Sequence, residues 1–260
     1  MPNWVCNHLT INGENAVEVM RSLLTENEES ECGYDLDFNK LIPMPEELNI
    51  VCGTITTNCA KLYVNAMLED CDAYIKYAGL FAKAFERDFI LTESEQAQLM
   101  QDALRYTDYP DKKLLFSNKA EVYAYGKRAL DNYEKYGAKD WYDWCCDNWG
   151  TKWNACHTQI NDLEKADIYF DTAWSAVPYI IAKIAELHPE CKIEYEYAEE
   201  DTGVNAGYII FENGEITSDE HFKDFSKEAY ETYFGLWGRE DEFKFNPQKG
   251  TYEYIDGEAM

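Results

Sequence analysis

Residues 1–13 read MPNWVCNHLTING, and this stretch decides the fold. Apolar and polar side chains alternate along it, with Val5, Leu9 and Ile11 in one set. The other set consists of Cys6, His8 and Thr10. The alternation predicts a half-buried strand, which Asn12-Gly13 ends in a turn. Apolar residues at helical spacing follow over residues 16–24, so the chain opens as a strand and a helix.

The same pattern returns late in the chain. Residues 166–171 and 192–197 (KIEYEY) read as strands, and Ser175 is placed to cap a helix between them that stops at Pro189. Residues 207–211 predict a further strand, which Asn213-Gly214 joins in a hairpin to residues 215–216. We also expect a strand over residues 34–41. This order predicts an α+β fold with a split βαβ antiparallel sheet.

A helical region interrupts this order. Thr92 with Glu95 has the spacing of a capping box, Asn118 with Glu121 resembles one, and Gly137 suits a helix end. We therefore expect a first half of the α+β core at 1–53, a helical insertion at 54–137 and the second half of the core at 138–216. An acidic helix and strand extension is expected at 217–260.

The charge is strongly negative and unevenly spread. Fifty acidic and 23 basic residues give a net charge of −27. Residues 1–53 carry 10 acids and 2 bases, and residues 190–260 carry 19 acids and 6 bases. Such a field opposes direct binding to nucleic acid or to an anionic membrane. No apolar run is long enough to span a bilayer, and the amino terminus is not a signal peptide, so we expect a cytoplasmic protein with reduced cysteines.

The acidic clusters are candidate partner-binding residues. They are Glu28, Glu29, Glu31, Glu194, Glu196, Glu199, Glu200, Asp201, Glu240, Asp241 and Glu242. Each cluster alone reads as a solvated surface. Carboxylates on one strand face repeat at about 6.6 Å, which is too sparse to imitate DNA, so several clusters would have to converge on one surface.

Catalytic and cofactor-binding signatures are missing. The sequence has no G-x-G-x-x-G, no P-loop, no H-E-x-x-H and no G-x-S-x-G. Cys145, Cys146, Cys156 and His157 lack the paired spacing of a zinc site and are expected to be structural. The tryptophans of residues 141–153 are expected in the core, because few Lys or Arg accompany them. We therefore expect no cofactor, no metal and no catalytic residue.

Four segments together resemble the YubB ferredoxin-like domain family. They are MPNWVCNHLTING at 1–13, LIPMPEEL at 41–48, NWGTKWNA at 148–155 and FDTAWSAVP at 170–178. The resemblance implies a ferredoxin-like core with a large inserted helical region. It also implies an origin on plasmids or phages, a structural role for the NWGTKWN block and no established reaction.

The leading hypothesis is a phage- or plasmid-encoded, non-enzymatic accessory protein that inhibits host defence. It would present acidic surface to a basic, nucleic-acid-binding host protein, as an anti-CRISPR or another DNA mimic does. One alternative is an enzyme of unrecognised type with a site near Cys156, His157 and Asp171. The other is a structural module whose acidity only confers solubility.

Overall fold

The computed structural model describes residues 3–86, 88–107 and 113–255 and divides the chain into two compact units. Unit 1 contains residues 1–43 and 146–260, and unit 2 contains residues 44–145. The insertion expected at 54–137 therefore lies within a longer unit. No helix among the described residues is long and apolar enough to cross a membrane.

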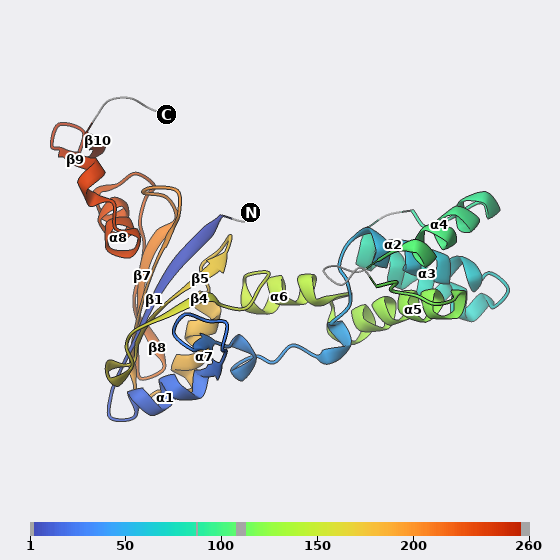
Figure 1. Cartoon of the computed structure of the whole chain (residues 1–260), viewed down its shortest axis with the longest axis horizontal. Coiled ribbons are helices and arrows are strands. Elements are labelled where there is room, and N and C mark those ends of the chain that lie inside the picture. Colours follow the sequence, from blue (N-terminus) through green and yellow to red (C-terminus); the bar gives the residue numbers. More distant parts are fainter. Residues whose placement is uncertain (1–2, 87, 108–112, 256–260) are drawn as a thin grey trace. The chain divides into compact units, whose positions relative to one another are not determined.

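Unit 1 is built on a six-stranded antiparallel sheet (Figure 1). Its strands are β1 (Trp4–Asn12), β4 (Cys156–Asp162), β5 (Asp167–Ala173), β6 (Lys192–Glu199), β7 (Ala206–Glu212) and β8 (Glu215–His221). They lie in the order β4-β5-β1-β6-β7-β8. Its longer helices are α1 (Ala16–Leu23), α7 (Pro178–Leu187) and α8 (Lys227–Trp237). The succession β1-α1-β4-β5-α7-β6 gives the ferredoxin-like βαββαβ core, so the predicted fold class is confirmed.

The predicted alternation sets the two faces of this sheet. Val5, Leu9 and Ile11 are fully or almost fully buried on the face where α1 packs against β1 and α7 packs against β6 and β7. The apolar face of α7 contributes Ile180 and Ile184 to the same core. Because successive side chains of a strand point to opposite faces, Cys6, His8 and Thr10 lie on the other side.

A buried polar network lies within this apolar core. The Tyr195 hydroxyl donates to Asn7 Oδ1 at 2.6 Å and accepts from the Val177 backbone N–H at 2.9 Å. Asn7 Nδ2 in turn lies 3.0 Å from Thr172 Oγ1 and 3.1 Å from the Phe170 carbonyl oxygen. The network joins β1, β5, β6 and the residue before α7, and burial raises the pKa of Tyr195 strongly.

Helix α8 covers one end of the opposite sheet face. Tyr233 and Phe234 pack in a cluster with Ala198 and Ala206 of the sheet. Trp237 Nε1 also donates to the Ala198 carbonyl at 3.0 Å. The chain ends in a hairpin of β9 (Phe243–Asn246) and β10 (Thr251–Tyr254), preceded by the short helix η4 (Glu240–Glu242). The expected carboxy-terminal helix and strand are both present, and β8 occupies the first residues of the range expected for them.

Two details of unit 1 differ from the prediction. The strand expected at 34–41 is only β3 (Tyr34–Leu36), which pairs with β2 (Leu24–Glu26) outside the main sheet. It ends because Asp37 caps the short helix η1 (Phe38–Lys40). Ser175 does not cap α7, which begins at Pro178 after Val177. The Ser175 carbonyl oxygen instead accepts a hydrogen bond from the Thr172 hydroxyl at 2.7 Å. A final short helix, η3 (Leu163–Lys165), connects β4 to β5.

Unit 2 is helical, as predicted. It contains η2 (Glu46–Leu48), α2 (Thr54–Ala66), α3 (Cys71–Phe85), α4 (Glu93–Arg105) and α5 (Lys119–Tyr136), and α6 (Trp141–Trp149) begins in it. The capping box of Thr92 and Glu95 is formed, and Asn118 caps α5. Gly137 ends α5 with a φ of 75°, in the left-handed region where glycine is favoured.

The contact between α2 and α5 depends on one glycine. A Cβ added at Gly126 would lie 2.1 Å from the Cys59 carbonyl oxygen and 2.8 Å from the Ala60 backbone nitrogen. Backbone atoms cannot yield as a flexible side chain does, so this position has no room for a side chain. Gly79 on α3 has nothing within 4 Å of the equivalent point.

We predict that Tyr195→Phe destabilises unit 1 by about 1–3 kcal/mol, because it leaves a buried amide oxygen and a backbone N–H without partners. Tyr208→Phe, which changes a half-exposed tyrosine of the same sheet, is the control and should change stability by less than about 0.5 kcal/mol. Urea unfolding measures both values. Equal effects of the two substitutions would contradict the role assigned to the network.

We predict opposite effects of two helical glycine substitutions in unit 2. Gly126→Ala should destabilise by about 1–3 kcal/mol, since α2 and α5 must separate. Gly79→Ala should stabilise by roughly 0.5–1 kcal/mol, since it only raises helix propensity. Thermal unfolding followed by circular dichroism tests the pair, and stabilisation by Gly126→Ala would refute the close approach.

Candidate functional site

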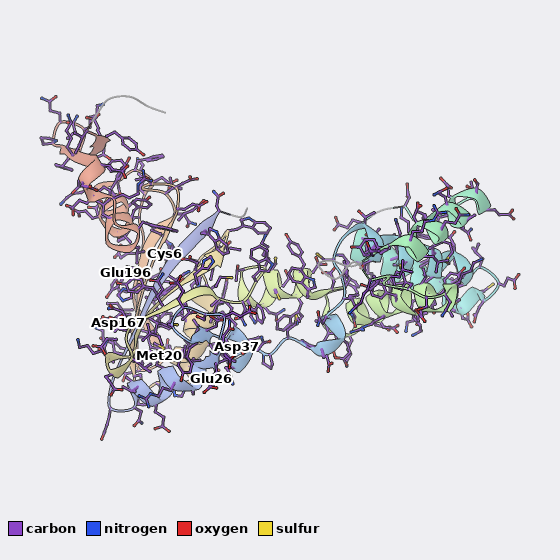
Figure 2. All side chains as sticks on the ribbon, in the orientation of Figure 1. Cys6, Met20, Glu26, Asp37, Asp167 and Glu196 are labelled. Carbon is purple, nitrogen blue, oxygen red and sulfur yellow. The ribbon has the colours of Figure 1, made fainter. Side chains whose placement is uncertain are left out.

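The sheet face opposite α1 and α7 is only partly covered. We call its outward side chains on β4, β5, β1, β6 and β7 the open face. They include Cys6, His8, Thr10, Asp167, Tyr169, Asp171, Glu194, Glu196, Tyr208 and Ile210, placed together by the strand register. Figure 2 labels Cys6, Glu196 and Asp167 on the sheet and Met20 on α1, which packs on the other face. Since α8 covers the Cys6 end, the rest of the open face remains accessible.

His8 lies at the centre of the open face between two carboxylates. Its Nε2 is 2.8 Å from Asp167 Oδ1 on β5, and its Nδ1 is 3.6 Å from Glu196 Oε2 on β6. The ring stacks on Tyr169, with 4.2 Å between centroids and 2° between planes. Three neighbouring strands therefore contribute to one cluster, in which the imidazole fills the space between opposing acids.

The protonation of His8 follows from this position. Burial alone would lower the pKa of His8, but the hydrogen bonds with Glu196 and Asp167 outweigh it, and the pKa is raised above its usual value. The imidazolium therefore persists to higher pH than in an exposed histidine. It offsets part of the repulsion between the two carboxylates that flank it.

A second cluster lies where β4 meets β5. His157 Nδ1 is 2.9 Å from Asp171 Oδ2, and the Trp4 ring meets His157 edge-on at 4.9 Å. Cys156 lies directly opposite Asp171 in the register. Burial and the nearby carboxylates of Asp171 and Asp35 raise the pKa of Cys156, so it is a neutral thiol and a poor nucleophile. The three residues of the enzyme alternative are thus neighbours, but the thiol is not activated.

Two exposed tryptophans adjoin this cluster. Lys152 Nζ lies 3.8 Å from the ring centroids of both Trp153 and Trp174, which are 36% and 45% exposed. Trp153 also lies 6.0 Å from Trp4. The expected core position holds for Trp144 and Trp149, which are buried, but not for Trp153. Trp149 Nε1 donates a hydrogen bond to the Ile42 carbonyl oxygen at 2.9 Å.

The predicted acidic residues fall on separate parts of unit 1. Glu194 and Glu196 lie on the open face, with Glu194 paired to Lys192 at 2.6 Å. Glu199 ends β6, where it accepts from Asn3 at 3.0 Å, and Glu200 and Asp201 follow it. We call these five residues, on β6 or directly after it, the β6 strip. Ala198, buried under α8, separates Glu194 and Glu196 from the other three.

The other acidic residues lie elsewhere in unit 1. Glu28, Glu29 and Glu31 lie in the turn between β2 and β3, which packs beside β4. Glu240, Asp241 and Glu242 form η4 after α8, and Arg239 already binds Glu242 through two nitrogens. No contact between these groups and the β6 strip is present among the described residues. The binding role of all eleven remains a prediction.

Within the described residues, no group of three or more His, Cys, Asp or Glu is arranged to hold a metal ion. Cys145 is buried and all nine cysteines are free thiols.

Sequence reasoning missed several members of the open face. Asp167 and Tyr169 belong to no motif, although both follow the alternation that placed His8 on β1 and Glu196 on β6. Pairing the predicted strands in antiparallel register would have brought them together.

We predict that His8→Gln destabilises the protein by about 1–2 kcal/mol at low pH and by less at high pH. A folded pKa above the unfolded value of about 6.5 gives a contribution that is complete below that value and is lost as the pH rises through the folded pKa. Urea unfolding across this range measures the change. A pH-independent loss would refute the charged pairing, and His188→Gln, outside the open face, is the control.

Comparisons with known proteins support the fold of the second half of the chain. Residues 148–240 match the family model described as "Ferredoxin-like domain in Api92-like protein". The match covers 93 of the 260 residues. The solved structure of protein api92 from Yersinia pseudotuberculosis is similar at 13% identity with a TM-score of 0.37, covering 86% of this chain and 99% of that one. No curated protein matches the chain.

The expected resemblance to the YubB family is therefore wrong. The family model that matches is that of Api92-like proteins, and the plasmid or phage origin implied by YubB loses its support with it. The ferredoxin-like fold itself is shown, and residues 148–240 are similar to the ferredoxin-like domain of Api92-like proteins.

Proposed function

We propose that unit 1 is a non-enzymatic binding module that takes a basic segment of a nucleic-acid-binding protein onto its open face. The observation that carries the proposal is the gathering of Asp167, Asp171, Glu194 and Glu196 on one sheet face, on the two strands β5 and β6 that flank β1. Strands lie about 4.8 Å apart, so the carboxylates of β5 and β6 are roughly 10 Å apart across β1. Two rows of acids on one face are an arrangement that a basic segment lying along β1 could contact.

The distribution of charge between the units also supports binding of a basic partner to unit 1. Unit 1 has 33 acidic and 11 basic residues, a net charge of −22, whereas unit 2 has 17 and 12, a net charge of −5. The negative field is therefore concentrated on the unit that carries the open face. Such a field steers a cationic partner and raises its association rate.

Aromatic side chains supply a second kind of contact. Tyr169 and Tyr208 lie among the carboxylates, and the exposed rings of Trp153 and Trp174 adjoin the Asp171 end. A tryptophan or tyrosine ring binds an arginine or lysine cation over its face and is a frequent interface anchor. Lys152 between Trp153 and Trp174 already shows the geometry that a partner cation would adopt.

We propose further that binding of unit 1 inhibits the partner. A protein that covers the basic surface of a nucleic-acid-binding partner prevents that partner from binding its own nucleic acid. A defence protein of a bacterial host is the partner class for which such inhibition, as by an anti-CRISPR, has an evident use.

The test uses two triple variants with the same charge change. Glu194→Gln with Glu196→Gln and Glu200→Gln alters the β6 strip, and Glu69→Gln with Asp88→Asn and Glu93→Gln alters exposed residues of unit 2. Proteins retained from bacterial lysate at low salt are identified by mass spectrometry, and each is then purified. We expect the first variant to weaken binding about tenfold or more and the second to leave it unchanged.

Inhibition is measured separately, as competition with DNA for the purified partner. Wild type should displace the DNA, with a steep salt dependence, and Cys156→Ser should do so equally. Retention of only neutral or acidic proteins, or equal loss in both triple variants, would refute the proposal. Loss of inhibition in Cys156→Ser alone would favour the enzyme alternative.

A further inference from the structure

Unit 2 contains a pocket of about 370 Å³ that no motif in the sequence pointed to. Its walls come from the start of α2, the end of α3 and the start of α6. The lining residues include Gly53, Thr57, Phe85, Lys139, Asp140 and Asp143. Its volume lies at the small end of the range of roughly 300–1,000 Å³ for small-molecule sites.

One wall holds a buried carboxylate oxygen without a partner. Asp140 is 1% exposed, and its Oδ1 accepts from the backbone N–H groups of Tyr142 and Asp143 at 3.1 and 3.2 Å. Its Oδ2 is buried and has no hydrogen-bond partner among the described residues. Burial raises the pKa of Asp140, as expected for a carboxyl that lacks a donor. Asp140 is one of the lining residues, so a donor bound in the pocket is a group that could satisfy this oxygen.

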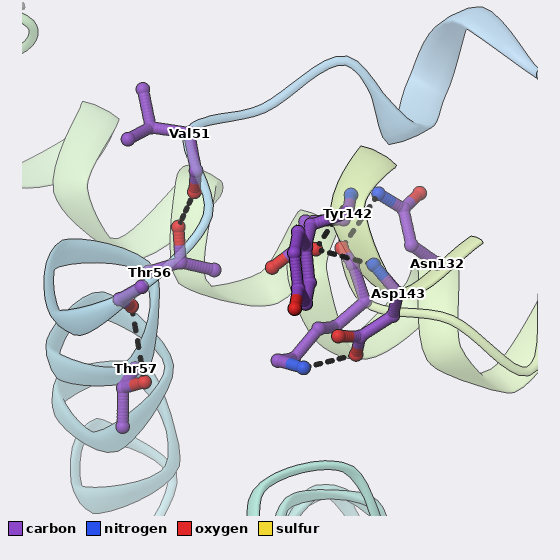
Figure 3. A network of polar contacts seen from close by, with 9 residues as sticks. Val51, Thr56, Thr57, Asn132, Tyr142 and Asp143 are labelled. Carbon is purple, nitrogen blue, oxygen red and sulfur yellow. Dashed lines mark hydrogen bonds and ion pairs between the residues drawn. The ribbon is translucent and has the colours of Figure 1, made fainter. Parts of the chain in front are cut away.

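The opposite wall offers donors. Helix α2 begins after Gly53 and has no side-chain cap. The Thr56 hydroxyl is bonded to the Val51 carbonyl and the Thr57 hydroxyl to the Gly53 carbonyl, so neither caps the helix. Figure 3 shows Thr56 and Thr57 on one side and Tyr142 and Asp143 on the other. The first N–H groups and dipole of a helix favour a carboxylate at such an end.

The charged pair beside Asp140 completes the wall. Lys139 Nζ pairs with Asp143 and lies 5.6 Å from the centroid of the Phe85 ring. The lysine is therefore already neutralised, which leaves Asp140 as the unpaired acid of the pocket. Phe85 and Tyr142 supply aromatic surface for an apolar group.

We infer that this pocket binds a small ammonium carboxylate, the class of the free amino acids. The ammonium group donates to Asp140 Oδ2, the carboxylate accepts from the first turn of α2, and the side chain packs beside Phe85. The site is independent of the open face and of the partner proposed for it.

The probes are the twenty free amino acids, each titrated at millimolar concentration into the full chain and followed by ligand-detected NMR and calorimetry. We expect at least one with an apolar or aromatic side chain to bind. Acetate and ethylamine, which carry only one of the two charged groups, should bind more weakly than that amino acid by about tenfold or more.

Asp140→Asn is the decisive variant. Asparagine caps a helix as well as aspartate does, so α6 keeps its start, but the oxygen that lacks a donor becomes an NH₂ group. We expect affinity to fall about tenfold or more. Asp70→Asn changes the cap of α3 outside the pocket and is the matched control, with affinity unchanged.

Ala84→Leu provides a second variant should Asp140→Asn perturb folding, because it fills the pocket from α3 and should abolish binding. Absence of binding by all twenty amino acids to the wild type would overturn the inference. So would binding that neither Asp140→Asn nor Ala84→Leu weakens.

Discussion

The hydrogen bonds of Tyr195 determine the geometry of unit 1. Its hydroxyl sits in an apolar core, where an unpaired polar group costs several kcal/mol, so the strands must lie where Asn7 and the Val177 N–H can reach it. Apolar packing excludes a shift of one residue between β1 and β6, because such a shift would bury charged side chains and expose the apolar ones. A shift of two residues would preserve the two faces, and the network excludes it because Asn7 would no longer reach the Tyr195 hydroxyl.

The strand register that the core determines also determines which side chains are neighbours on the open face. Asn7 and His8 are neighbours on β1, so the register that brings Asn7 to Tyr195 also sets His8 between Asp167 and Glu196. The core therefore specifies which carboxylates meet on the surface. Any activity of the open face depends on a network that no partner would touch.

Much of this fold could be predicted because side-chain periodicity reports burial directly. The strand β1, the strand β6 and the hairpin at Asn213-Gly214 follow from alternation and turn chemistry, as do the caps at Thr92 and Asn118. The strand β4 could not, since its sequence CHTQIND is polar and its pairing is interrupted twice. Nor could the accessible part of the open face, because α8 covers one end through contacts far apart in the sequence. The pocket at Asp140 could not be predicted from the sequence either, since an aspartate before a helix is ordinarily only a cap.

Several acids of unit 1 lie on the strands of its sheet and not in loops. Carboxylates scattered over loops keep a protein soluble at little electrostatic cost, whereas carboxylates gathered on one face of a sheet repel one another. In unit 1 that repulsion is offset by specific cations, with His8 between Asp167 and Glu196 and Lys192 beside Glu194. A cationic partner, as proposed for the open face, would relieve on binding the part of the repulsion that these cations leave.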